Sequence, residues 1–155
     1  MYHIKKTILI TLACVTLAAC GTKETQNKQK TTPIAGTWKL ISGTLIEKGD
    51  TVVTDYTQNQ TMIKVINETH FAFLKHDLLK GKDSTAVYGS GGGRYTLVGD
   101  QYTEHLEYCS DRQWEDNSFS FTVAVKNDTL VQQGVEKIEN LGVNRINIEK
   151  YVRIK

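Results

Sequence analysis

A single carboxylate, Glu104, lies on the apolar side of an alternating run of residues, QYTEHLEY (101–108). A carboxylate among apolar side chains is costly to bury unless it is paired or hydrogen-bonded. Two side chains are candidates for its partner, the Tyr95 hydroxyl and the Lys64 ammonium group. Glu104 therefore has two interpretations. It is either a polar anchor that orients a ligand in a cavity, or part of a Tyr–Glu–Lys network whose members only hydrogen-bond and pair with one another.

The other reactive side chains do not follow a catalytic or metal-binding pattern. His70, His76 and His105 form no HExxH motif, and the chain has no CxxC spacing. There is no Gly-x-Ser-x-Gly elbow, and the glycine run at 89–93 lacks the Gly-Lys-Ser/Thr ending of a phosphate-binding loop. We therefore expect no enzymatic activity, no cofactor and no metal ion. The alternative is an enzyme that uses Glu104 or a histidine as its acid and base.

An acidic loop, CSDRQWEDN (109–117), surrounds Trp114 with Asp111, Glu115 and Asp116. Carboxylate oxygens are ligands that Ca²⁺ accepts, so weak calcium binding is one interpretation of the loop. A solvated surface loop is the other, and it is the one we expect.

The elements that must position these residues are β-strands. Val, Ile, Thr, Tyr and Phe are frequent between residues 34 and 155, in short runs separated by turn residues. Four residue pairs suit tight hairpin turns: Gly49-Asp50, Asn67-Glu68, Gly99-Asp100 and Asn127-Asp128. Consecutive hairpins without a long helix predict an all-β fold, an antiparallel up-and-down sheet that closes into a barrel of eight to ten strands.

Two of the predicted turns fix the register of their strands. A two-residue turn at 99–100 places Val98 opposite Gln101, and one at 127–128 places Val125 opposite Leu130. Opposed residues share a face, and each hairpin then has one apolar and one polar face. The side chains expected to line a ligand site inside the barrel are Trp38, Phe71, Phe73, Tyr95, Glu104, Tyr108, Phe119 and Phe121.

The first 19 residues have the layout of a secretory signal, a basic start followed by an uncharged apolar run too short to span a membrane. The run ends in Leu-Ala-Ala-Cys-Gly (17–21), which resembles a bacterial lipoprotein signal. That resemblance implies cleavage after residue 19, lipid attachment to Cys20 and anchoring in a membrane of the bacterial cell envelope. The sequence does not determine whether the protein faces the periplasm or the cell exterior. We favour the periplasmic side of the outer membrane.

A polar segment, residues 20–33, follows the signal and has too few apolar groups to fold, so we expect a flexible tether. One domain of residues 34–155 remains. Loss of residues 1–19 removes two of the 19 basic residues and none of the 17 acidic ones, which leaves the chain formally neutral. A neutral chain gives no support for nucleic-acid binding, and the sequence leaves the oligomeric state open.

Gly36-Thr37-Trp38 near the start of the domain and Arg153 near its end resemble the pattern of the calycins, the lipocalin-like proteins. MIKVINETHFAF (62–73) and GGGRYTLVGDQYTEHLEY (91–108) are similar to small lipocalin-like lipoproteins of Bacteroidetes. The resemblance implies a lipocalin-like barrel in which Gly36 and Arg153 are structural and the arginine packs across Trp38 at the closed end. The segment 132–150 has room for only one or two helical turns before the last strand.

These observations predict an envelope lipoprotein whose barrel binds a small apolar or amphipathic ligand. The alternative is a protein–protein interaction module in the envelope, with a barrel filled by its own side chains and no small ligand.

Overall fold

The structure, a computed structural model, describes residues 32–155. The predicted signal at 1–19, the predicted lipidation site Cys20 and residues 21–31 of the predicted tether lie outside the described residues. Within 32–155 the chain forms one antiparallel sheet, and its helical segments are two short 3-10 turns, none of them long and apolar enough to cross a membrane. The strands are β1 (Gly36–Glu47), β2 (Asp50–Asp55), β3 (Gln60–Ile66), β4 (His70–Asp77), β5 (Tyr88–Val98), β6 (Gln101–Cys109), β7 (Asn117–Lys126), β8 (Thr129–Ile138) and β9 (Val143–Arg153), with the turns η1 (Arg112–Trp114) and η2 (Glu139–Leu141).

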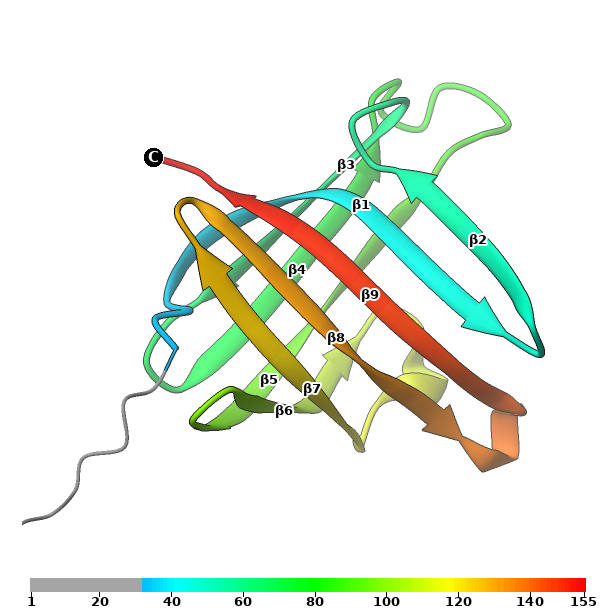
Figure 1. The fold of residues 1–155 in the computed structure, drawn as a ribbon. Helices are drawn as coiled ribbons and strands as arrows, with labels where there is room; N and C mark the ends of the chain where they lie inside the picture. The colour runs from blue at the N-terminus through cyan, green and yellow to red at the C-terminus, as the bar shows by residue number, and fades with distance from the viewer. Residues whose placement is uncertain (1–31) are drawn as a thin grey trace, which may run out of the picture.

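The sheet closes on itself because the first strand pairs with the last (Figure 1). One edge of β1 pairs with β9, and its other edge pairs first with β3 and further along with β2. β2 and β3 therefore follow one another along the same edge, separated by residues 56–59, and together take the place of one barrel strand. The described residues form an eight-stranded, antiparallel, up-and-down closed barrel, which confirms the predicted fold class.

Short turns set the register of the sheet. Val98 pairs with Gln101 and Val125 pairs with Leu130, as predicted. The first hairpin turns at residues 48–49, one position before the predicted pair, because Glu47 pairs with Asp50. The turn between β3 and β4 is also displaced by one position, to residues 68–69.

A β-bulge between β5 and β6 contradicts one prediction. Leu106 pairs with Gly93 but Tyr108 pairs with the next residue, Gly92, so Glu107 is an extra residue and the alternation of side chains reverses. Tyr108 is consequently 69% exposed, and the prediction that it faces the barrel interior is wrong. The backbones come very close here, because a Cβ added at Gly93 would lie 1.9 Å from a backbone oxygen of β6. The glycine run at 89–93 is thus part of strand β5 and is packed between β4 and β6.

One end of the barrel is closed by the Trp38 ring, which is fully buried. The Trp38 indole donates a hydrogen bond to the carbonyl of Ile34 at 2.7 Å, and the Arg153 guanidinium carbon lies 4.0 Å from the ring centroid. Arg153 also donates to the carbonyl of Ala35 at 2.8 Å. Gly36 has a φ of 143°, and a Cβ there would collide with the arginine. The packing of arginine on tryptophan that the sequence resemblance implied is present.

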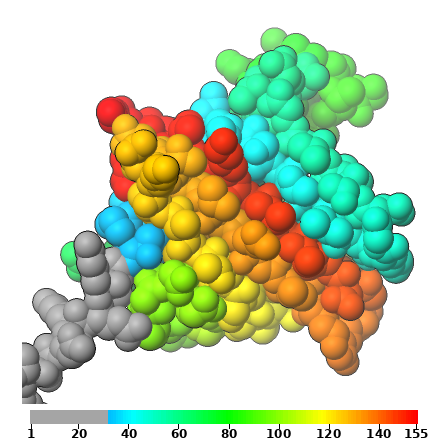
Figure 2. All heavy atoms as spheres, in the orientation of Figure 1, coloured from blue at the N-terminus to red at the C-terminus, as the bar shows by residue number. Residues whose placement is uncertain are grey.

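The connections at the other end are the β1–β2, β4–β5, β6–β7 and β8–β9 loops. In Figure 1 this end lies to the right, with the η2 turn at the lower right. The side chains of β7, β8 and β9 form an unbroken surface on the face shown in Figure 2. The barrel wall is therefore closed on this side.

Candidate functional site

A cavity of about 320 Å³ occupies the barrel interior on the side away from Trp38. Its volume lies at the lower end of the range for small-molecule sites, about 300–1,000 Å³. Two charged residues border the cavity near this end, the half-buried Lys75 from β4 and the exposed Asp111 from the β6–β7 loop. The cavity therefore extends from the middle of the barrel towards the end that carries these loops.

The cavity has one apolar side. Side chains from β3, β4, β6 and β7 form it: Met62, Phe73, Leu106, Phe119 and Phe121. All but Phe73 are buried in the same hydrophobic cluster, and Phe73 packs against that cluster. The aromatic rings give an apolar ligand a large contact area.

The opposite side is polar and comes from the last hairpin, β8–β9. Its inward side chains are Gln132, Glu136, Arg145, Asn147 and Glu149. Alternation requires this arrangement, because Gln132 pairs with Glu149 and Glu136 pairs with Arg145. The cavity is therefore amphipathic, with an aromatic wall facing a stripe of charged and amide groups.

Within this stripe, both carboxylate oxygens of Glu136 have hydrogen-bond partners. The Arg145 Nε donates to one carboxylate oxygen of Glu136 at 2.7 Å, and Asn147 donates to the other at 2.8 Å. The Arg145 guanidinium carbon also lies 5.1 Å from the centroid of the Trp114 ring. Both partners of this ion pair thus have their main contacts inside the protein.

Lys64 and Glu104 form a second ion pair deep in the barrel, where they are 2% and 8% exposed. The Lys64 Nζ also donates to the Gln132 side chain at 2.9 Å. Tyr95, the other predicted partner of Glu104, instead donates its hydroxyl proton to the carbonyl of Asn67 at 2.7 Å. The ammonium group of Lys64 is surrounded by three aromatic rings at 5.3–5.7 Å from their centroids: Phe71, Tyr102 and Tyr151.

Glu149 is the third inward carboxylate and is bound differently. Its Oε2 accepts a hydrogen bond from the Tyr151 hydroxyl at 2.8 Å, but no ion pair to it occurs within residues 32–155. Enclosure in the barrel raises the pKa of Glu149, Lys64 opposes this shift, and the charges of Glu104 and Glu136 add to it. Burial likewise raises the pKa of Tyr151, so its phenol stays protonated and donates.

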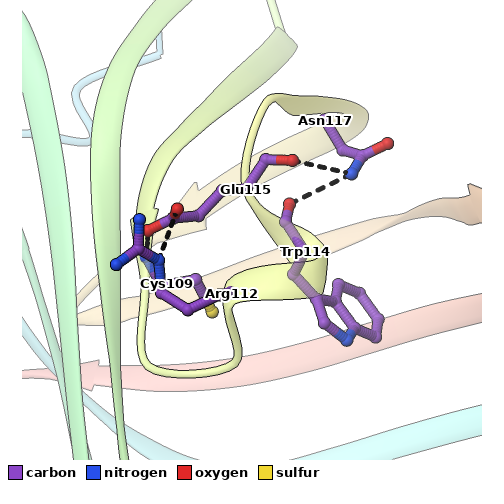
Figure 3. A network of polar contacts seen from close by, with 5 residues as sticks. All are labelled: Cys109, Arg112, Trp114, Glu115 and Asn117. Carbon is purple, nitrogen blue, oxygen red and sulfur yellow. Dashed lines mark hydrogen bonds and ion pairs between the residues drawn. The ribbon is translucent and has the colours of Figure 1, made fainter.

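The loop between β6 and β7 holds Trp114 at the cavity through a compact polar network (Figure 3). The Glu115 carboxylate accepts from the backbone N–H of Cys109 at 2.9 Å and from the Arg112 Nε at 2.7 Å. The Asn117 amide donates to the carbonyls of Trp114 and Glu115, each at 3.1 Å. The acidic residues expected to be merely solvated therefore include one, Glu115, that ties the loop together.

The residues predicted to line the site fall into three groups. Phe73, Glu104, Phe119 and Phe121 border the cavity. Trp38 and Phe71 are buried in the closed half, and Tyr95 packs there half-buried. Tyr108 lies outside the barrel.

The predicted lining of the ligand site did not include Trp114 or the polar stripe of β8–β9. The alternation beyond the 127–128 turn predicts that Gln132 faces inward, and extending it by four residues places Glu136 there as well. Trp114 gave a weaker signal, a lone aromatic residue in a polar loop.

A scan against models of protein families and a search of curated proteins find no match to the chain. Within residues 32–155, no group of three or more His, Cys, Asp or Glu side chains is placed to hold a metal ion.

Proposed function

We propose that this chain is a lipocalin-like envelope lipoprotein that binds a small amphipathic ligand inside its barrel. The observation that carries the proposal is the 320 Å³ cavity with one aromatic side and one polar side. Ligand sites are commonly concave and mostly apolar, with a few polar groups that fix orientation. The polar groups here are held by ion pairs and hydrogen bonds within the barrel, so the site is largely preformed.

Two features support a lipocalin-like barrel in particular. Arg153 packs on Trp38 at the closed end, as in the pattern that the sequence resembles, and the eight strands follow each other around the barrel in chain order. The short η2 turn stands where a longer helix precedes the last strand in lipocalins proper. Both features support a lipocalin-like barrel that differs from the lipocalins proper in the segment before its last strand.

The proposed anchor is lipid on Cys20, and its support is the order of basic start, apolar run and Leu-Ala-Ala-Cys-Gly (17–21). Two acyl chains give stable attachment where one gives only marginal binding. With about a dozen polar residues between anchor and domain, the barrel would stay close to the membrane and could take up amphipathic molecules from it.

Native mass spectrometry of the full chain, purified from a bacterial envelope, tests ligand binding. We expect an extra small-molecule mass that is lost on denaturation. Leu45→Trp, at the cavity wall, should remove this mass because the larger ring fills the space. Val53→Trp is the matched control on the neighbouring strand, since Val53 is 68% exposed and outside the lining. A bare protein mass for all three proteins would contradict the proposal.

The alternative, a protein–protein interaction module, is favoured by one observation. Among the described residues β2 has only β1 as a partner, and Val52 and Val53 on it are 59% and 68% exposed. An unpaired strand edge is a template for pairing with another chain. A bare mass in the experiment above, together with a protein that cross-links to β2, would support this alternative.

A further inference from the structure

The inward carboxylates of the cavity outnumber its cations. Glu104 is paired with Lys64, and Glu136 is paired with Arg145. Glu149 has the Tyr151 hydroxyl as its hydrogen-bond partner and no ion pair within residues 32–155. The lining of the cavity below its rim therefore carries one formal negative charge in excess.

An enclosed carboxylate without a cation is costly, since the barrel replaces water that would otherwise solvate it. Lys64 lowers this cost through its charge but is held by Glu104 and Gln132.

From this arrangement we infer that the cavity is selective for amphipathic amines. The protonated nitrogen of the ligand pairs with the Glu149 carboxylate, and its apolar body lies against the Phe73, Phe119 and Phe121 rings. This inference rests on the proposed function, because it names the ligand class of the same cavity. A cationic head group supplies the charge that the cavity lacks, and the aromatic wall supplies the contact area that a short alkyl or aryl group needs.

The same arrangement disfavours anionic ligands such as fatty acids. Neither of the two cations below the rim, Lys64 and Arg145, is free to receive a ligand carboxylate; the third cation of the lining, Lys75, lies at the rim. Lys64 is 2% exposed and already contacts Glu104 and Gln132, while Arg145 is bonded to Glu136. A ligand anion would have to break one of these pairs and would also lie near Glu149.

The test compares three ligands of equal chain length, octylamine, octanoate and 1-octanol, by titration calorimetry at neutral pH with the full chain. We expect octylamine to bind about tenfold or more tightly than either of the others, as for one added charge pair. Glu149→Gln should reduce octylamine affinity by about the same factor and leave octanol affinity unchanged, because the amide keeps the shape and the hydrogen bond of the carboxylate. Glu139→Gln is the matched control, since Glu139 lies outside the lining and pairs with Lys137 on the surface.

The outcomes separate this inference from the proposed function. If octanol or octanoate binds as tightly as octylamine, or if Glu149→Gln retains the amine preference, the amine inference is overturned while ligand binding stands. If none of the three binds, or if Leu45→Trp leaves their binding unchanged, the proposed cavity site falls as well. Octanol binding by Glu149→Gln shows that the variant has folded with its cavity intact.

Discussion

Lys64 on β3 and Glu104 on β6 form an ion pair across the barrel interior, although their strands are not neighbours in the sheet. Gln132 on β8 accepts a hydrogen bond from the same ammonium group at 2.9 Å. Three separate strands thus converge on one buried cation. The Lys64–Glu104 pair lies between the closed half of the barrel, which holds the Trp38 and Phe71 rings, and the cavity.

Glu104→Gln should destabilise the protein by about 3–5 kcal/mol, because it leaves the Lys64 ammonium group buried without its counter-charge. Denaturant-induced unfolding measures the loss. The double variant Lys64→Met/Glu104→Leu should recover most of it, since apolar residues of similar volume often replace a buried ion pair without cost.

Glu107→Gln is the control for this experiment. Glu107 lies on the same strand and pairs with the exposed Arg94 on the outer face. Water screens such a pair, so its loss should leave the unfolding midpoint nearly unchanged. Equal effects of the two substitutions would show that the Lys64–Glu104 pair is not buried as described.

Arg153→Ala should open the closed end. The variant loses the contact between the guanidinium group and the Trp38 ring, worth about 0.5–2 kcal/mol, together with the hydrogen bond to Ala35. The midpoint of chemical unfolding should fall, and the Trp38 emission should shift towards that of a solvated indole. Lys155→Ala, which removes an exposed charge two residues away, should change neither quantity.

The local parts of the fold were predictable because two-residue turns leave no freedom in register. Val98–Gln101 and Val125–Leu130 follow directly from the Gly99-Asp100 and Asn127-Asp128 turns. The alternation of side chains then assigns the inner face of each hairpin.

The exposed position of Tyr108 was not predictable from the alternation along its strand. One extra residue in the β5–β6 ladder reverses the alternation, and nothing in the apolar pattern of QYTEHLEY (101–108) marks it. The signal lies on the neighbouring strand, where only glycine allows the approach seen at Gly93. A bulge is a property of two strands, so a pattern along one strand does not report it.

The polar half of the cavity was missed for a different reason. The sequence analysis did not include Glu136 and Glu149 in the site, and charged side chains are rarely buried unless they are paired. The hairpin partner Arg145 satisfies the first, and Tyr151 and Lys64 moderate the charge of the second. Lys64 comes from a strand far away in the sequence, and only the closed barrel brings it there.

Cys20→Ala should release the protein from the membrane fraction and abolish metabolic labelling with a palmitate analogue. The thioether-linked lipid is the proposed anchor, and a single residue carries it. Cys109→Ala is the matched control, because Cys109 is a free thiol at the cavity and should affect neither fractionation nor labelling. Membrane retention of Cys20→Ala would contradict lipid anchoring at this position.

The raised pKa of Glu149 predicts a pH-dependent stability difference between the wild-type protein and Glu149→Gln. Below about pH 4.5, the ordinary value for glutamate, the carboxyl is protonated in both the folded and the unfolded chain, and the two proteins should differ least. As the pH rises, the unfolded chain loses this proton more readily than the folded chain, which costs the wild type stability that the variant keeps. The melting temperature of Glu149→Gln should therefore exceed that of the wild type by a margin that grows between pH 4.5 and neutral pH. Glu139→Gln should show the opposite sign, because the hydrogen bond and charge of Lys137 lower the pKa of Glu139. A margin that stays constant with pH would mean that Glu149 titrates in the barrel as it does in water.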